Sequence, residues 1–200
     1  MKSGTAYAAR LKKAYAEFRQ TVPKPKTPEP DDPLHRLAVG ILSVSCTEKQ
    51  AEEAIKRLLS IMVDWNEVRV SRPLEVHKAT GRLIPNGQER VRRLVRAMGA
   101  VFDRENRLSL DRLYDIGRRE ARQYLEGLDG ADEYATASVF LWSLGGHAIP
   151  VNDRLLEALR SKDLVHPNAT RAEVQAFLER HVSAAEAKEF CIVMESFPDS

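Results

Sequence analysis

Cysteine is scarce in this sequence, and the two that occur, Cys46 and Cys191, are far apart. Two distant cysteines cannot form a disulfide framework and are typical of proteins from a reducing compartment. An iron–sulfur cluster needs several closely spaced cysteines, and the histidines show no metal-ligand spacing. We therefore expect no iron–sulfur cluster, no other metal and no cofactor.

A long apolar run is also missing, which argues against a membrane-spanning helix. The start, Met1–Gly4, is not followed by the apolar stretch of a signal peptide. The formal net charge is only +2, too small to indicate nucleic-acid binding by itself. Any affinity for DNA would have to come from local clusters of arginine, at 90–96 and 118–122. We expect a monomer in the cytoplasm or at the nucleoid, with no membrane partner.

The residues that are present predict an all-α protein. Hydrophobic residues make up 43% of the chain and charged residues 30%, a balance typical of globular domains. Apolar residues recur at helical spacing along most of the chain. Thr47 with Gln50 and Thr170 with Glu173 have the spacing of capping boxes. The best candidate for a strand is the short segment Val68–Val70.

Prolines divide the chain near its start. A helix is expected at 3–20, and the alternating prolines of 22–30 then favour an extended strap across the surface or a flexible boundary. We therefore expect residues 1–32 to form an N-terminal helix with a proline-rich strap. Residues 33–200 are expected to form a single globular helical domain.

The order of several motifs resembles a known family. Leu128–Ala137 contains a glycine turn that opens an apolar helix, and Pro150–Asp153 then leads into a further helix. Upstream, Ile41–Glu48 is similar to a helix junction of the same family, and Ile84–Gly87 precedes another core helix. This series resembles the helix-hairpin-helix DNA glycosylases, the endonuclease III superfamily, over about residues 33–195.

The resemblance implies a two-lobed helical fold with a helix-hairpin-helix, and DNA, duplex or damaged, as the partner. In that family, backbone N–H groups of the hairpin hold a phosphate, and the damaged base is flipped out of the stack. Carried over to this sequence, the DNA-binding candidates come from the hairpin, a loop and an arginine cluster: Gly127, Gly130, Asp132, Ser45, Arg118 and Arg119. Ser45 replaces a glutamine that fills the gap left by the flipped base.

The chemistry of the site departs from the family pattern. Asp132 stands where the family has its second hairpin glycine, and Tyr134 stands at the Schiff-base lysine. A phenol cannot form an imine, so we do not expect a lyase reaction. A gapless match puts Asn152 at the catalytic aspartate, whereas a shift of one residue selects Asp153. The candidate catalytic residues are thus Asp153, Asn152 and Tyr134, and Asn152 or Asp153 equally suits a plain helix N-cap.

Three interpretations remain open from the sequence. The first is a divergent monofunctional DNA glycosylase in the class of base-excision repair proteins. The second is a catalytically inactive protein that kept the glycosylase fold and binds DNA or a protein partner. The third is an unrelated helical domain whose resemblance is coincidental. Whether the protein is an enzyme is left undecided.

Overall fold

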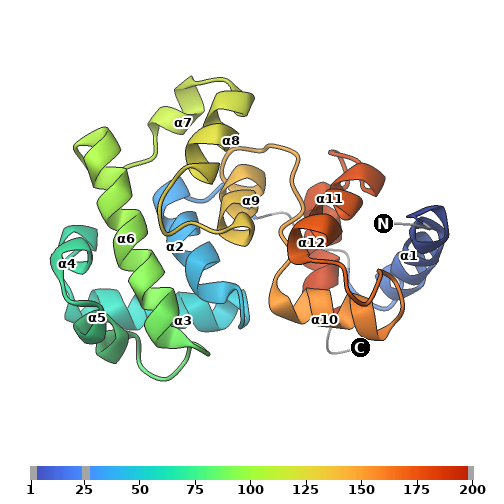
Figure 1. Cartoon of the computed structure of the whole chain (residues 1–200), viewed down its shortest axis with the longest axis horizontal. Coiled ribbons are helices and arrows are strands. Elements are labelled where there is room, and N and C mark those ends of the chain that lie inside the picture. Colours follow the sequence, from blue (N-terminus) through green and yellow to red (C-terminus); the bar gives the residue numbers. More distant parts are fainter. Residues whose placement is uncertain (1–3, 24–27, 198–200) are drawn as a thin grey trace. The chain divides into compact units, whose positions relative to one another are not determined.

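The computed structural model describes residues 4–23 and 28–197, and every regular element in these ranges is a helix (Figure 1). The prediction of an all-α protein is confirmed. Val68–Val70, the best candidate for a strand in a sequence with no convincing one, forms the end of a short helix instead. A helix forms here because Asp64 accepts a hydrogen bond from the Glu67 backbone N–H at 2.9 Å and caps the start of the helix. Residues 24–27 of the expected strap lie outside the described residues.

The chain packs into two compact units. The terminal unit combines Met1–Glu29 with His147–Ser200, and the inner unit is Pro30–Gly146. The helices of the terminal unit are α1 (Gly4–Arg19), α10 (Asp153–Ser161), α11 (Arg171–His181) and α12 (Ala187–Glu195). The helices of the inner unit are α2 (Pro33–Ser43), α3 (Glu48–Ile61), α4 (Trp65–Val70), α5 (Pro73–Thr80), α6 (Gly87–Glu105), α7 (Arg112–Asp115), α8 (Arg118–Glu126) and α9 (Glu133–Trp142).

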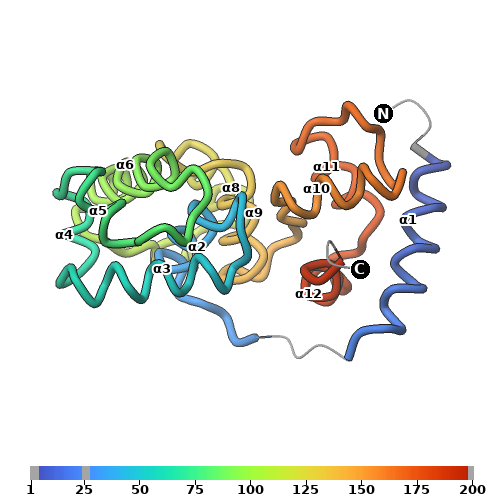
Figure 2. Tube along the Cα trace, turned by 90° about the horizontal axis from the view of Figure 1, so that it is seen from below, coloured from blue at the N-terminus to red at the C-terminus, as the bar shows by residue number. Residues whose placement is uncertain are grey.

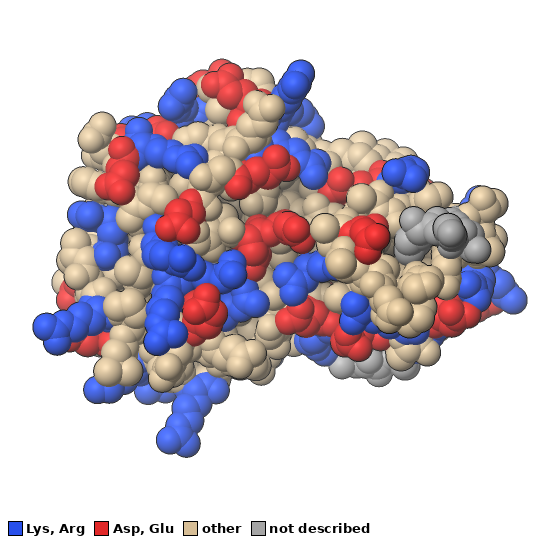
Figure 3. All heavy atoms as spheres, in the orientation of Figure 1, with Lys and Arg blue, Asp and Glu red and all other residues tan. Residues whose placement is uncertain are grey.

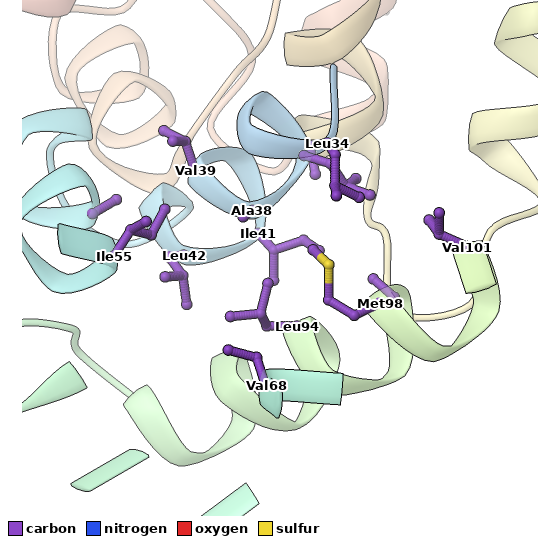
Figure 4. Close-up of a cluster of buried hydrophobic side chains, with 14 of the residues drawn as sticks. Leu34, Ala38, Val39, Ile41, Leu42, Ile55, Val68, Leu94, Met98 and Val101 are labelled. Atoms are coloured by element: carbon purple, nitrogen blue, oxygen red, sulfur yellow. The ribbon is translucent and has the colours of Figure 1, made fainter. Parts of the chain in front are cut away.

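Helix α2 is the centre of the inner unit, where it packs against α9, α3 and α6. Its crossing with α9 is close: a Cβ atom on Gly40 would lie 2.7 Å from the Cα atom of Ala135. On another side, Ile41 of α2 meets Leu94 and Met98 of α6, and all three side chains are fully buried (Figure 4). Helices α4 and α5 cover α6 further along. The apolar stripe of α6 is therefore enclosed, and its polar face is left for solvent or a ligand.

A buried arginine fixes the beginning of α2. Arg36 is almost fully buried, and its guanidinium donates to Asp31 and, at 2.8 Å, to Glu48 at the start of α3. Burial alone would lower the pKa of Arg36, but the Glu48 and Asp31 carboxylates outweigh it and raise that pKa. The guanidinium also lies over the ring of Trp142 at 5.9 Å. The segment before α2 is thus joined to α3 and α9.

Helix α1 packs with the C-terminal helices of the terminal unit (Figure 2). Tyr15 contacts the ring of Phe190 at 5.0 Å, and Phe18 contacts Phe197 at 5.1 Å. Arg19 donates to Glu189 at 2.5 Å. The sequence predicts that α1 forms one segment with the proline-rich strap, because no local pattern indicates contacts with residues so far along the chain.

The predicted capping boxes at Thr47 and Thr170 are confirmed. The Thr47 hydroxyl accepts from the Gln50 N–H at 3.2 Å, and the Gln50 side chain accepts from the Thr47 N–H at 3.0 Å. Thr170 and Glu173 make the same reciprocal pair at 3.2 and 2.8 Å. Among the described residues, no helix is long and apolar enough to cross a bilayer.

Candidate nucleic-acid interface

The helix-hairpin-helix consists of α8, α9 and the turn between them, residues 127–132. Gly127 ends α8, and its N–H donates to the Gln123 carbonyl at 3.1 Å. Arg104 of α6 donates to the carbonyl of Gly127 and, at 3.0 Å, to that of Tyr124. The hairpin is therefore anchored to α6 through its backbone.

Gly130 lies where the turn touches α6. Its φ is +86°, a region that side chains other than glycine rarely adopt. A Cβ atom there would lie 2.3 Å from the Arg93 carbonyl oxygen and 2.7 Å from the Ala97 nitrogen. The close packing of the turn on α6 is therefore sufficient reason for a glycine at this position, whether or not DNA approaches.

Asp132 caps α9 and closes an ion pair. One carboxylate oxygen accepts from the Ala135 N–H at 3.0 Å, and the other lies 2.8 Å from an Arg90 Nη atom. Both side chains are largely buried, at 15% and 14% exposure. A helix N-terminus attracts anions, and here the chain's own carboxylate takes that place.

The arginines on the exposed side of α6 have acidic neighbours. Arg93 lies 3.3 Å from Glu89, and Arg92 approaches the same carboxylate at 3.9 Å. Arg96 lies 3.7 Å from Asp129 of the turn. Figure 3 shows this face, where basic side chains gather over the first half of α6 with acidic side chains between them. The positive charge is thus partly compensated within the inner unit.

The cluster at the start of α8 is more open. Arg118 is exposed and donates to the Gly145 carbonyl at 2.6 Å, and no acidic side chain among the described residues pairs with it. Arg119 is exposed and makes no ion pair with any described residue. Arg122 pairs with Glu126 at 3.0 Å. Of the predicted DNA contacts, Arg118 and Arg119 are the two whose charge is uncompensated in the described part of the chain.

Two other predicted site residues lie in the inner unit. Tyr134 is in the first turn of α9 and is buried, with 4% of its surface exposed. Ser45 lies in the loop between α2 and α3 and is half-buried. At this depth Tyr134 belongs to the packing of α9.

Asn152 and Asp153 lie together at the start of α10 in the terminal unit. The Asn152 side chain accepts from the Leu155 N–H at 2.8 Å and is the N-cap. Asp153 is the first helical residue, and its carboxylate accepts from the guanidinium of Arg171 on α11. Its side chain remains 41% exposed. The preceding loop is held by His147, which bonds the Val182 carbonyl at 2.9 Å.

Within residues 4–23 and 28–197, no group of histidine, cysteine and carboxylate side chains has the arrangement of a metal site. Cys46 is buried in the inner unit and Cys191 lies on α12 of the terminal unit.

Comparison with known proteins places the fold. No family model and no curated protein matches the sequence, but solved structures resemble it closely in three dimensions. A trapped covalent intermediate of endonuclease III with DNA has a TM-score of 0.71 and 17% identity, over 95% of this chain and 85% of that chain. The Helicobacter pylori 3-methyladenine DNA glycosylase has a TM-score of 0.64 and 12% identity, over 95% and 96%.

A third structure, the Clostridium acetobutylicum 8-oxoguanine glycosylase/lyase with DNA, has a TM-score of 0.65 and 13% identity, over 96% of this chain and 69% of that chain. Identities this low establish the fold alone. The chain has the helical fold of the endonuclease III-like DNA glycosylases, as the sequence resemblance predicted.

Sequence reasoning missed one feature of the inner unit, a basic hollow between α5 and the start of α6. Its lining includes His77, Arg82 and Arg92. The sequence predicts that Ile84–Gly87 precedes a core helix, but it does not indicate that side chains from different helices line a cavity beside this segment.

Proposed function

We propose that this protein binds DNA and acts in the manner of base-excision repair proteins. The observation that carries the proposal is the fold, shared along nearly the whole chain with glycosylases whose structures contain DNA. The exposed, uncompensated charges of Arg118 and Arg119 support it, because phosphate contacts by basic side chains supply much of the affinity for DNA.

As its activity we propose hydrolysis of the N-glycosidic bond of a damaged nucleotide, with Asp153 as the carboxylate. Asp153 is accessible and is held in place by Arg171. A fixed carboxylate can stabilise the positive charge that develops on the sugar as the base leaves. Asn152 carries no charge and caps α10, so its proposed role is to orient this helix start. Tyr134 cannot form an imine, so strand cleavage by a lyase step is not part of the proposal.

A second candidate is a DNA-binding protein without catalysis. The Asp132 carboxylate of the hairpin pairs with Arg90 and caps α9, and the Asp153 carboxylate at the start of α10 pairs with Arg171. Both carboxylates therefore have structural partners, and their positions do not require a catalytic role.

Single-turnover assays separate these candidates. The purified protein, in excess, is incubated with duplexes that carry uracil, an alkylated base, an oxidised base or a mismatch, and abasic product is measured after alkaline cleavage. We expect product from at least one duplex and its loss in Asp153→Asn. Binding without product from any duplex would leave the second candidate. No binding to intact, nicked or abasic duplex would overturn the DNA-binding proposal itself.

A further inference from the structure

Two cavities adjoin on the inner unit where α5 leads into α6. Their volumes are about 500 and 640 Å³, and both are lined by His77 and Arg82. One extends over Asn86 and the first residues of α6, and the other reaches Arg57 on α3. Together they form what is called here the basic hollow, which is large enough to hold a phosphate with part of its carrier.

The lining of the basic hollow is strongly unbalanced in charge. Arg57, Lys78 and Arg82 are exposed, and none of them forms an ion pair with a described residue. The one acidic residue in the lining is Glu89, and it is already engaged by Arg93 at 3.3 Å. The Arg57 guanidinium also lies close to Gly81, 3.0 Å from where a Cβ atom would be. Three cations thus line the hollow, and none of them is paired with an acidic side chain in the described part of the chain.

A histidine forms part of the wall. The His77 ring lies against the start of α6, so that a Cβ atom on Gly87 would be 2.7 Å from its Cε1 atom. Its Nδ1 atom is buried and has no hydrogen-bond partner among the described residues. A buried ring nitrogen left unpaired costs free energy, and this one lies against the start of α6, 3.0 Å from where a Cβ atom on Gly87 would be.

The start of α6 adds donors to the same place. Asn86, its N-cap, has a left-handed backbone with φ 52° and makes no side-chain hydrogen bond to the helix. Helix α6 is 19 residues long, and its first N–H groups carry the positive end of the helix dipole. This is the reverse of α9, whose first turn is capped by the Asp132 carboxylate.

We propose that the basic hollow binds a phosphate group, held by Arg82 and the first N–H groups of α6, with the His77 ring as part of the wall. Arg57 and Lys78 add positive charge around it. Two sources share this chemistry: a phosphodiester of the DNA backbone, and a small phosphate such as a free ion or nucleotide. The first source rests on the proposed function; the second does not.

Binding of duplex DNA by the full chain is titrated across salt for the native protein, Arg82→Ala and a control, Arg107→Ala. Arg107 is exposed and lies outside the hollow, and its loss removes the same charge. In parallel, the amide signals of Gly87 and Gln88 are followed by NMR during titration with inorganic phosphate.

If a DNA phosphate occupies the hollow, Arg82→Ala weakens binding by about tenfold and lowers the salt slope by about 1, while Arg107→Ala changes neither. If a small phosphate occupies it, phosphate shifts both amide signals in the native protein and not in Arg82→Ala, with DNA binding equal in the two. The NMR result can be obtained even if the native protein binds no DNA. A failure of the proposed function can therefore be distinguished from a failure of the phosphate site. Unmoved signals together with equal salt slopes would overturn the phosphate site.

Discussion

An Nη atom of Arg90 on α6 lies 2.8 Å from a carboxylate oxygen of Asp132 at the start of α9, and both side chains are largely buried. The other Asp132 oxygen holds the Ala135 N–H. One carboxylate therefore caps a helix and joins it to its neighbour. The hairpin gains an internal anion where the family pattern has a glycine, and the consequences for stability can be measured.

Asp132→Ala should lower the free energy of unfolding by about 2–3 kcal/mol. The cap contributes about 1 kcal/mol, and the remainder arises because Arg90 keeps a buried charge without its partner. The matched control is Asp129→Ala, since Asp129 is exposed and only approaches Arg96 at 3.7 Å. It should cost less than about 0.5 kcal/mol. Urea unfolding followed by circular dichroism measures both, and equal losses would contradict the role given to Asp132.

Gly130→Ala should destabilise the inner unit by about 3 kcal/mol or more, because a strained φ and a backbone clash add together. Gly145→Ala is the control: its φ is +61°, but nothing lies within 4 Å of the added Cβ atom. Backbone strain alone should cost it about 1 kcal/mol. The same unfolding experiment decides, and a Gly130 variant no less stable than the Gly145 variant would show that the turn is not packed on α6 as described.

Asn152 tests the helix cap and the chemistry together. Asn152→Ala should lower stability by about 1 kcal/mol, because the bond to the Leu155 N–H is lost. Asn152→Asp should preserve the cap and place a second carboxylate beside Asp153. If the proposed glycosylase activity is correct, this variant should keep or raise the rate of abasic-site formation. A rate reduced to the level of Asp153→Asn would assign Asn152 a direct role in the reaction.

The raised pKa of Tyr124 predicts a loss of stability at alkaline pH. Burial, followed by the neighbouring Glu105 carboxylate, raises the pKa of Tyr124 to about 12, from the ordinary value of 10.0. The folded protein therefore retains a proton that the unfolded chain has lost, and the free energy of unfolding should fall between about pH 10 and 12. Tyr124→Phe should reduce that fall. Ultraviolet titration of the tyrosines measures the pKa, and ionisation of Tyr124 near 10 would contradict it.

The sequence could predict those features of the fold that depend on interactions between residues close together in the chain. The capping boxes at Thr47 and Thr170 depend on residues three apart, and the ordered motifs identified the fold. Val68–Val70 was the best strand candidate because two β-branched residues favour a strand locally, whereas the burial of Val68 with Val70 exposed suits a helix with one buried face.

Longer-range features gave no local signal. The contact of Tyr15 with Phe190 spans most of the chain. The basic hollow brings together Arg57, His77 and Arg92 from three helices. The sequence also left two roles open for Asn152 and Asp153. The structure finds Asn152 engaged as the cap and Asp153 in an ion pair, while their part in catalysis stays a prediction.

The terminal unit is assembled from both ends of the chain, with the inner unit inserted between its parts. During synthesis the inner unit is complete once residue 146 has left the ribosome, and it can fold at that point. Helix α1 precedes the inner unit in the chain but has to wait for Phe190 and Phe197 before its aromatic side chains find their partners. A segment made before the inner unit thus reaches its final place after it, and until then Tyr15 and Phe18 are open to chaperones or to aggregation.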